Sequence, residues 1–201
     1  MADFPFTEPL SNEVFDQLFR EARTINVWRD KAVSDDLIKQ IYDLTKMGAT
    51  SANCCPARFH FIKSAEAKAR LKPLVMEGND TKVMQAPVTV IIANDLNFAD
   101  KIPQLFPHNP GAKEWFADPA VAEITAMRNG TLQGAYLMLA ARALGLHCGP
   151  MSGFDNAAVD AEFFAGTSLK SNFICALGYG TDEDVFPRSP RLAFDEAAAI
   201  L

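Results

Sequence analysis

One long helical stretch in the second half of the chain constrains the fold more than any other feature of the sequence. Asp118 and Pro119 supply an N-cap and a proline in the first helical turn, and a helical pattern continues to Gly145. At 1.5 Å per residue this helix would be about 39 Å long, and few surface helices reach that length. We therefore expect it to be a central element of the fold.

Small residues recur every four positions along this helix, at Ala126, Gly130 and Gly134. They form a smooth ridge that another helix could approach closely. Glycine inside a helix costs about 1 kcal/mol relative to alanine, so the ridge needs a compensating contact. Close packing against this ridge is the expected compensation.

Strands are predicted between the helices. Residues 58–63 alternate apolar with polar side chains, which is typical of a half-buried strand, whereas residues 88–93 are almost all apolar. A strand that is apolar on both sides is expected to be covered on both faces, so 88–93 is predicted to be central. Shorter strands are predicted at 146–148 and 173–178, and residues 149–153 are predicted to form a loop.

Shorter helices complete the pattern. Ser11 and Ser34 precede amphipathic stretches that end near Ala22 and Gly48. Helical runs are also predicted after Ser64, around residues 159–163 and at the end of the chain. No internal repeat or Gly/Ser-rich linker divides the sequence, so we predict a single domain over residues 1–201 with an α+β or α/β layered architecture.

Composition limits the possible partners. Nineteen Lys and Arg residues against 25 Asp and Glu give a net charge of −6, without a local basic cluster, so no nucleic-acid partner is expected. The first residues lack a basic segment followed by an apolar one. The most apolar helical stretch, 135–146, is interrupted by Arg142 and is too short to cross a bilayer. We expect a cytoplasmic protein that binds no membrane.

The cysteines predict neither a disulfide framework nor a metal site. Cys54 and Cys55 are adjacent, Cys148 and Cys175 lie far apart, and no Cys-x-x-Cys or zinc-type His spacing occurs. His147 and Cys148 could form half of a metal site. We interpret them instead as a strand-end pair packed in the core, because free cysteine is usually buried.

The dinucleotide-binding motifs are absent. Residues 178–183 (Gly-Tyr-Gly-Thr-Asp-Glu) begin like a dinucleotide fingerprint and follow a predicted strand, but the third glycine is missing. The following Asp-Glu-Asp-Val-Phe-Pro cannot open a helix that receives a pyrophosphate. A P-loop is missing as well, so no resident dinucleotide or nucleoside triphosphate is predicted.

Four separate segments could form one site for flavin mononucleotide (FMN): 23–26, 50–53, 150–153 and 188–191. Arginine offers a planar charged fork for a phosphate, and Ser, Thr and Asn match ribityl hydroxyls and the pyrimidine edge of the ring. Glycine lets backbone N–H groups approach a flat ring closely. Taken singly, each segment has a simpler explanation as a helix-end cation, a turn former or a loop. Their combination favours the FMN site.

The sequence resembles the FMN-dependent nitroreductases along nearly its whole length, and within them the malonic semialdehyde reductases of bacterial pyrimidine utilisation. The motifs that carry the resemblance are Ala22-Arg23-Thr24 with Asn26 and Trp28, residues 50–58, 149–155, 169–172 leading to 178–180, and 190–192. Two positions depart from the family pattern. Asn26 replaces a frequent Arg or Lys, and Cys55-Pro56-Ala57 replaces Gln-Pro-Trp.

The resemblance implies an α+β layered domain with a central mixed sheet flanked by helices and a long central helix at a homodimer interface. It gives the glycine ridge an interpretation as a subunit contact, with a helix contact inside one subunit as the alternative. It also implies two FMN sites at the interface, built from Arg23, Thr24, Asn26, Ser51, Asn53, Pro150, Met151, Ser152, Gly153, Arg188 and Arg191.

The implied activity is hydride transfer from NADPH or NADH through FMN to a small acceptor, with no catalytic side-chain nucleophile. The subgroup implies that malonic semialdehyde is reduced to 3-hydroxypropanoate. The carboxylate of that substrate would need a cation, for which Arg58 and Arg128 are the candidates. The alternatives are a broad nitroaromatic or quinone reductase and a non-catalytic flavin-binding redox protein that uses Cys54 and Cys55.

Overall fold

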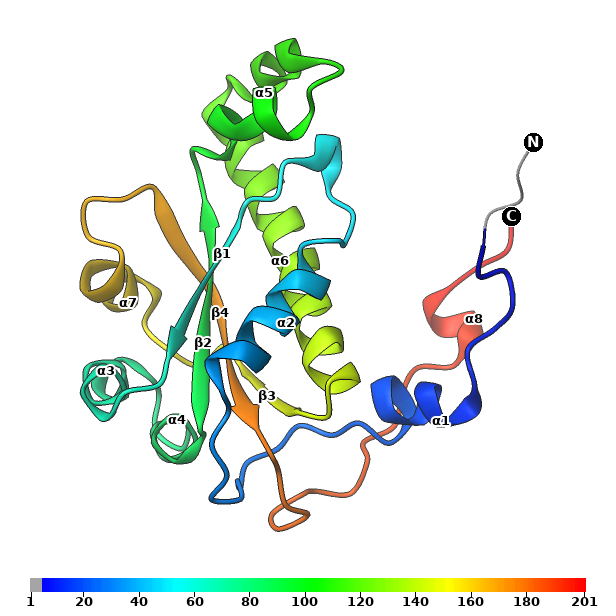
Figure 1. Ribbon diagram of the computed structural model, residues 1–201, viewed down its shortest axis with the longest axis vertical. Helices are drawn as coiled ribbons and strands as arrows, with labels where there is room; N and C mark the ends of the chain where they lie inside the picture. The colour runs from blue at the N-terminus through cyan, green and yellow to red at the C-terminus, as the bar shows by residue number, and fades with distance from the viewer. Residues whose placement is uncertain (1–4) are drawn as a thin grey trace.

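A four-stranded antiparallel sheet forms the centre of the molecule, which a computed structural model describes over residues 5–201 (Figure 1). The strands lie in the order β1-β2-β4-β3. They comprise β1 Ala57–Ile62, β2 Val88–Asp95, β3 His147–Met151 and β4 Leu169–Gly178.

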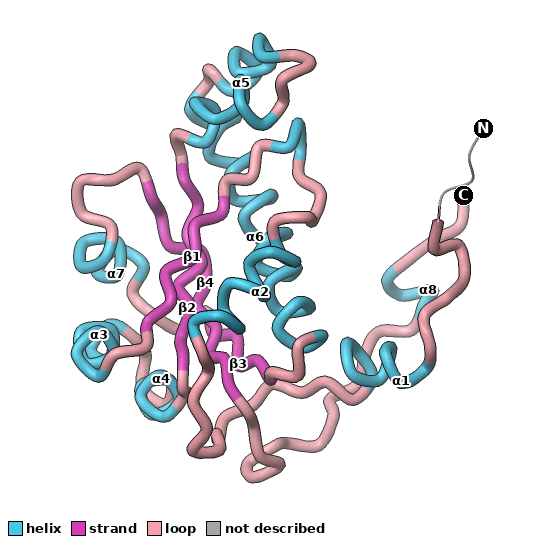
Figure 2. The backbone as a smooth tube through the Cα atoms, viewed as in Figure 1, coloured by secondary structure: helices cyan, strands magenta, loops and turns pink. Residues whose placement is uncertain are grey.

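Helices cover both faces of this sheet (Figure 2). On one face lie α2 (Asp35–Thr45) and α6 (Pro119–Ala143), and on the other lie α3 (Ala65–Leu71), α4 (Asp80–Gln85) and α7 (Asn156–Phe163). The α+β layered architecture is therefore confirmed. The expected mixed sheet is antiparallel at every pairing of the four strands, and parallel pairing within residues 5–201 is limited to one bridge between Thr24 and Cys148.

Short elements connect and flank these layers. They are α1 Asn12–Phe15, the π-helical turn η1 Asp16–Arg20, the 3-10 turns η2 Ser51–Asn53, η3 Lys72–Leu74, η4 Phe98–Lys101 and η5 Pro110–Phe116, and the helices α5 Ile102–Leu105 and α8 Phe194–Ala197. The α1, η1 and α8 elements lie to one side of the sheet and its helices (Figure 1). Among residues 5–201, no helix combines the length and the apolar character that a bilayer crossing needs.

Strand β2 is covered on both faces, as its composition predicts. Val88, Val90 and Ile92 pack in a cluster with Leu137 of α6, and the alternate residues Ile91 and Ala93 pack with residues of α3, α4 and α7. All of these β2 side chains are fully buried. The period-2 geometry of a strand thus divides one apolar run between two cores.

Several predicted boundaries are changed by tertiary pairing. Residues 149–151 belong to β3 and not to a loop, because Gly149 and Pro150 lie opposite Ala176 and Cys175 of β4.

Helix α2 has the predicted Ser34 cap, whose Oγ accepts the Leu37 N–H at 3.1 Å.

The glycine ridge of α6 faces the sheet of its own chain. A Cβ atom on Gly130 would lie 1.9 Å from Asn94 Oδ1, and one on Gly134 would lie 2.5 Å from Phe173 Cζ. The interpretation of the ridge as a subunit contact is therefore wrong. The alternative, a helix contact inside the subunit, is right about the subunit and wrong about the partner, which is the sheet. The opposite face of α6 exposes apolar side chains, namely Val121, Ile124 and Leu132.

We expect Gly134→Ala to destabilise the protein, although alanine favours helix. The propensity gain is about 1 kcal/mol, whereas forcing a methyl group against the Phe173 ring costs about 1–3 kcal/mol. A net loss of up to about 2 kcal/mol should appear in urea unfolding. Gly111→Ala is the matched control, because its Cβ would meet only Asn109 Oδ1 at 3.6 Å. Equal stability of the two variants would contradict the tight contact between α6 and the sheet.

Candidate functional site

A basic groove of about 510 Å³ brings together four parts of the chain. The link after η1 contributes Arg23, Thr24 and Asn26, the C-terminal tail contributes Arg188 and Arg191, and α4 and α6 add Lys82 and Arg142. None of the described residues that line the groove carries a carboxylate. In a chain of net charge −6, this local excess of positive charge makes the groove a site for an anion.

Hydrogen bonds fix the tail along the link after η1. The guanidinium of Arg23 donates to the Phe186 carbonyl, Asn26 Nδ2 donates to the Asp184 carbonyl at 3.2 Å, and Arg188 Nη2 donates to the Ala22 carbonyl at 3.2 Å. The bridge between Thr24 and Cys148 attaches the same link to the edge strand β3. The predicted phosphate-binding residues of these two segments therefore lie together.

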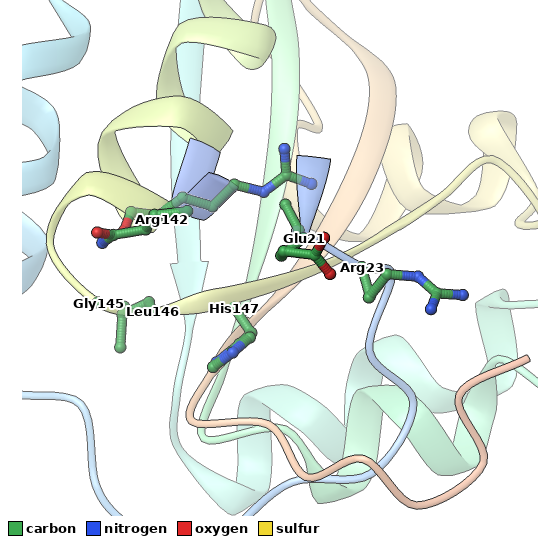
Figure 3. Close-up of a pocket in the computed structure, with 8 residues that line it drawn as sticks. Glu21, Arg23, Arg142, Gly145, Leu146 and His147 are labelled. Carbon is green, nitrogen blue, oxygen red and sulfur yellow. The ribbon is translucent and has the colours of Figure 1, made fainter. Parts of the chain in front are cut away.

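A smaller cavity of about 240 Å³ lies beside the groove, between η1, the end of α6 and the start of β3 (Figure 3). Glu21, Arg142 and His147 line it, and the Arg23 side chain points away from it. His147 Nδ1 accepts the Gly180 N–H at 3.2 Å. Burial, followed by the positive charges of Arg29 and Arg142, lowers the pKa of His147, so this imidazole is neutral at pH 7.

The segment 150–153 contributes backbone more than side chains. Met151 is buried in the core, and Pro150 is a strand residue. The Gly153 carbonyl accepts hydrogen bonds from Met76 N–H at 2.9 Å and from Asn79 Nδ2 at 3.0 Å. A Cβ atom on Gly153 would lie 2.7 Å from Asn79 Nδ2, so only glycine permits this approach.

Ser51 and Asn53 lie apart from the basic groove. They precede β1, at the opposite edge of the sheet from β3, where Thr24 is bridged. Figure 1 shows the link between α2 and β1 running toward α5, at the end of the molecule opposite to the link that follows α1 and η1. Asn53 lines a separate cavity of about 460 Å³ with Cys55, Arg58 and Gln133. The predicted cofactor-binding residues of one chain therefore do not all lie in the same groove.

The segment around Asn53 has an unusual backbone. Ala52 and Asn53 have φ values of 49°, and Cys55 has a φ value of 39°, all in the left-handed region that favours glycine. Such residues cost about 1–3 kcal/mol each and persist only where the surrounding structure fixes them. Asn53 Nδ2 donates to the Leu105 carbonyl at 2.8 Å, and the thiol of Cys55 donates to Asn53 Oδ1.

A protein-family model described as "Nitroreductase family" matches residues 19–180. That stretch includes the link after η1, the segment around Asn53, all four strands and α6. The chain belongs to the nitroreductase family.

Relatives and solved structures agree with this assignment. The chain is 59% identical over 192 residues to a Caulobacter vibrioides protein with the provisional name NADH dehydrogenase/NAD(P)H nitroreductase, covering 96% of this chain and 98% of that one. It is 59% identical over 186 residues to HadB of Ralstonia pickettii, which carries the same provisional name, covering 91% and 95%. A provisionally named nitroreductase of Exiguobacterium sibiricum, solved in complex with FMN, has the same fold, with a TM-score of 0.84, 19% identity, and coverage of 98% of this chain and 100% of that one.

Sequence reasoning missed Asn79 and Lys82 of this nitroreductase. Lys82 lines the basic groove from α4, and Asn79, one turn earlier, bonds to the Gly153 carbonyl. The local sequence 78–85 has little apolar periodicity, and no helix was predicted there. An Asn-x-x-Lys spacing, which puts both side chains on one side of a helical turn, was the available signal.

The two candidate arginines for a substrate carboxylate differ in their surroundings. Arg58 Nη2 pairs with Asp95 Oδ2 at 2.6 Å, and its Nη1 donates to the carbonyls of Cys55 and Ala57. Asp95 Oδ1 also accepts Ser168 Oγ at 2.6 Å. These contacts give Arg58 a structural role at the end of β1. Arg128 is exposed on α6.

The adjacent cysteines are poorly suited to thiol redox chemistry. Cys54 is completely buried in a cluster with Phe98 and Ile102. Burial raises the pKa of the Cys54 thiol to about 11, so the reactive thiolate is scarce at pH 7. Within residues 5–201, no group of three or more His, Cys, Asp or Glu side chains is placed to hold a metal ion.

We expect Arg58→Met to destabilise the protein before any substrate is added. The substitution leaves the Asp95 carboxylate, which is 14% exposed, without its cation and should cost about 1–3 kcal/mol. Thermal unfolding of the purified protein measures the change. Arg128→Met is the control, because it removes an exposed cation and should leave the midpoint within about 1 °C. A stable Arg58→Met variant would return Arg58 to the list of substrate-binding candidates.

Proposed function

We propose that the chain is an FMN-dependent oxidoreductase that uses NADPH or NADH to reduce a small acceptor. The convergence of Arg23, Lys82, Arg188 and Arg191 on one groove carries the proposal. Several fixed guanidinium and ammonium groups suit a phosphate dianion, which each can contact by charge-assisted hydrogen bonds. The Thr24 hydroxyl and the Asn26 amide in the same groove suit the ribityl hydroxyls.

Polar groups of α4 suit the ring end of the same cofactor. The Asn79 side chain donates to the Gly153 carbonyl one turn before Lys82, which lines the groove, and the missing Cβ atom of Gly153 leaves room for that amide. When bound, FMN would supply the two-electron hydride chemistry that the side chains lack. The chain's own residues bind the phosphate, orient the ring and restrict access to one face of it.

We infer that the complete site forms between two copies of the chain. Ser51 and Asn53 lie at the sheet edge opposite the basic groove, so a second copy is needed to bring them to the same cofactor. Two surfaces are available for this assembly: the outer apolar face of α6, defined above, and exposed apolar side chains of the two terminal segments, which include Phe19, Leu192 and Phe194.

The acceptor that we propose is malonic semialdehyde, reduced to 3-hydroxypropanoate. Its carboxylate needs a cation close to the reacting carbonyl, and Arg128 supports the proposal better than Arg58, whose guanidinium is engaged by Asp95. Arg128 is exposed on the outer face of α6 and precedes Asn129, whose Oδ1 accepts the Ser51 N–H at 2.8 Å. The names of the relatives favour a second candidate, reduction of nitroaromatic compounds.

Arg191→Ala should weaken FMN binding by about tenfold or more, because it removes a charge-assisted phosphate contact. Titrating flavin-free protein with FMN and following the flavin fluorescence measures the affinity. Riboflavin, which lacks the phosphate, is the internal control and should bind the variant and the unchanged protein equally. An unchanged FMN affinity in the folded variant would remove the tail from the phosphate site.

Malonic semialdehyde should be reduced with a kcat/KM roughly 10- to 150-fold higher than propanal, because the paired carboxylate fixes the carbonyl in the transition state. Consumption of NAD(P)H with each acceptor measures the ratio. Arg128→Met should bring the ratio near one while leaving the propanal rate unchanged. Equal rates with both aldehydes, together with much faster turnover of nitroaromatic compounds, would replace the aldehyde by the nitroreductase activity.

A further inference from the structure

Two buried amide side chains on α6 hold the segment 50–57 from within the core. Asn129 and Gln133 are 2% and 4% exposed, although α6 is otherwise packed on the sheet by apolar or small residues. Asn129 Oδ1 accepts the Ser51 N–H at 2.8 Å, and Gln133 Oε1 accepts the Ala57 N–H at 2.8 Å. One turn of α6 thus binds the segment near both of its ends.

A third contact from the same face completes the attachment. Tyr136 donates its hydroxyl to the Ala49 carbonyl at 3.0 Å. Asn129, Gln133 and Tyr136 are spaced four and three residues apart, which places them in one row along the helix. The row therefore runs alongside the chain from Ala49 to Ala57.

The held segment is the strained one. Ala52, Asn53 and Cys55 adopt positive φ values between these anchor points, and no glycine relieves them. The Thr50 hydroxyl accepts the Cys55 N–H at 3.2 Å, which closes the turn from inside. A backbone of this kind relaxes unless its surroundings fix it. The α6 amides fix the backbone on either side of the turn, and the Leu105 carbonyl accepts the Asn53 amide at 2.8 Å.

We propose that Asn129 and Gln133 are positioning residues of the flavin site: they fix the segment 50–57 in the conformation that presents Ser51 and Asn53 to the cofactor. The inference rests on the proposed function, because only a bound flavin gives Ser51 and Asn53 a ligand. Each α6 amide acts through a backbone N–H group that would otherwise be free to turn.

Binding of flavins without turnover tests the proposal. Asn129→Leu keeps the approximate volume and removes the acceptor. Asn129→Asp keeps an Oδ acceptor for the Ser51 N–H, and burial keeps its carboxyl protonated, so that it can also donate to the Thr125 carbonyl, which accepts the Asn129 amide at 2.9 Å. We expect Asn129→Leu to weaken both FMN and riboflavin about tenfold, because the segment contacts the part that the two share. Asn129→Asp should stay within about threefold of the unchanged protein. The pair Gln133→Leu and Gln133→Glu repeats the test at the other end of the segment.

Leu137→Ala separates positioning from general stability. Leu137 lies one turn further along α6 and is completely buried in the apolar cluster that contains Val90 and Ile92. This variant should lower the unfolding midpoint and leave both flavin affinities unchanged. The inference would be overturned if Asn129→Leu and Gln133→Leu bound flavins as well as the unchanged protein does. It would also be overturned if their flavin affinities fell no more than that of Leu137→Ala.

The wild-type titration keeps the two hypotheses distinguishable. Wild-type protein that binds neither FMN nor riboflavin would overturn the proposed function, and the inference with it. Wild-type protein that binds FMN, with leucine variants that bind it equally well, would overturn only the positioning role. A loss confined to FMN, with riboflavin binding intact, would also contradict it, because that pattern belongs to the phosphate contacts of the groove.

Discussion

The close contact between α6 and the sheet is the constraint on which the rest of the structure depends. Gly130 and Gly134 let the helix backbone approach the side chains of Asn94 and Phe173, so the helix lies lower on the sheet than a leucine-rich helix could. Because α6 lies so close to the sheet, its polar side chains reach the segments that connect neighbouring helices and strands. Arg142 Nη1 donates to the Leu18 carbonyl at 2.9 Å, and Gln17 Nε2 donates back to the Arg142 carbonyl at 2.6 Å. One helix therefore holds η1, which leads into the basic groove, and the separate segment around Asn53.

Local sequence signals predicted the elements whose conformation depends on local chemistry. The apolar run of β2, the Ser34 cap and the Asp118-Pro119 start of α6 each appear in the structure, because burial on two faces and helix capping leave direct traces in composition. Tertiary contacts decided the rest. Strand β4 lies between β2 and β3 and runs antiparallel to both, so β2 and β3 do not pair as parallel neighbours. No local sequence pattern encodes this strand order. The partner of the glycine ridge was equally invisible, because a small-residue spacing specifies a close approach without specifying what approaches.

The candidate site shows the same division. Arg23, Thr24 and Asn26 were predicted to lie with Arg188 and Arg191, and they line one groove. Residue chemistry was sufficient there, because charged forks and hydroxyls are recognisable in any order along a chain. It was insufficient for Lys82, because an Asn-x-x-Lys spacing does not show that α4 packs beside the groove. It also could not show that Arg58 is engaged by Asp95, because that partner lies 37 residues away, on the neighbouring strand.

A site divided between two copies, as proposed above, would explain why strain and charge are kept in different parts of one chain. The cations of the groove repel one another, and their mutual repulsion is relieved by a bound dianion. The strained turn at Ala52 and Asn53 depends on α6 of its own chain and not on those charges. Under the proposed arrangement, a flavin would contact the groove of one copy and the turn of the other. Its binding free energy would then stabilise the dimer as well as each fold, since a ligand stabilises whichever state binds it. The rigid attachment of α6 to the sheet transmits that coupling, because neither half of the site can shift without moving the central helix.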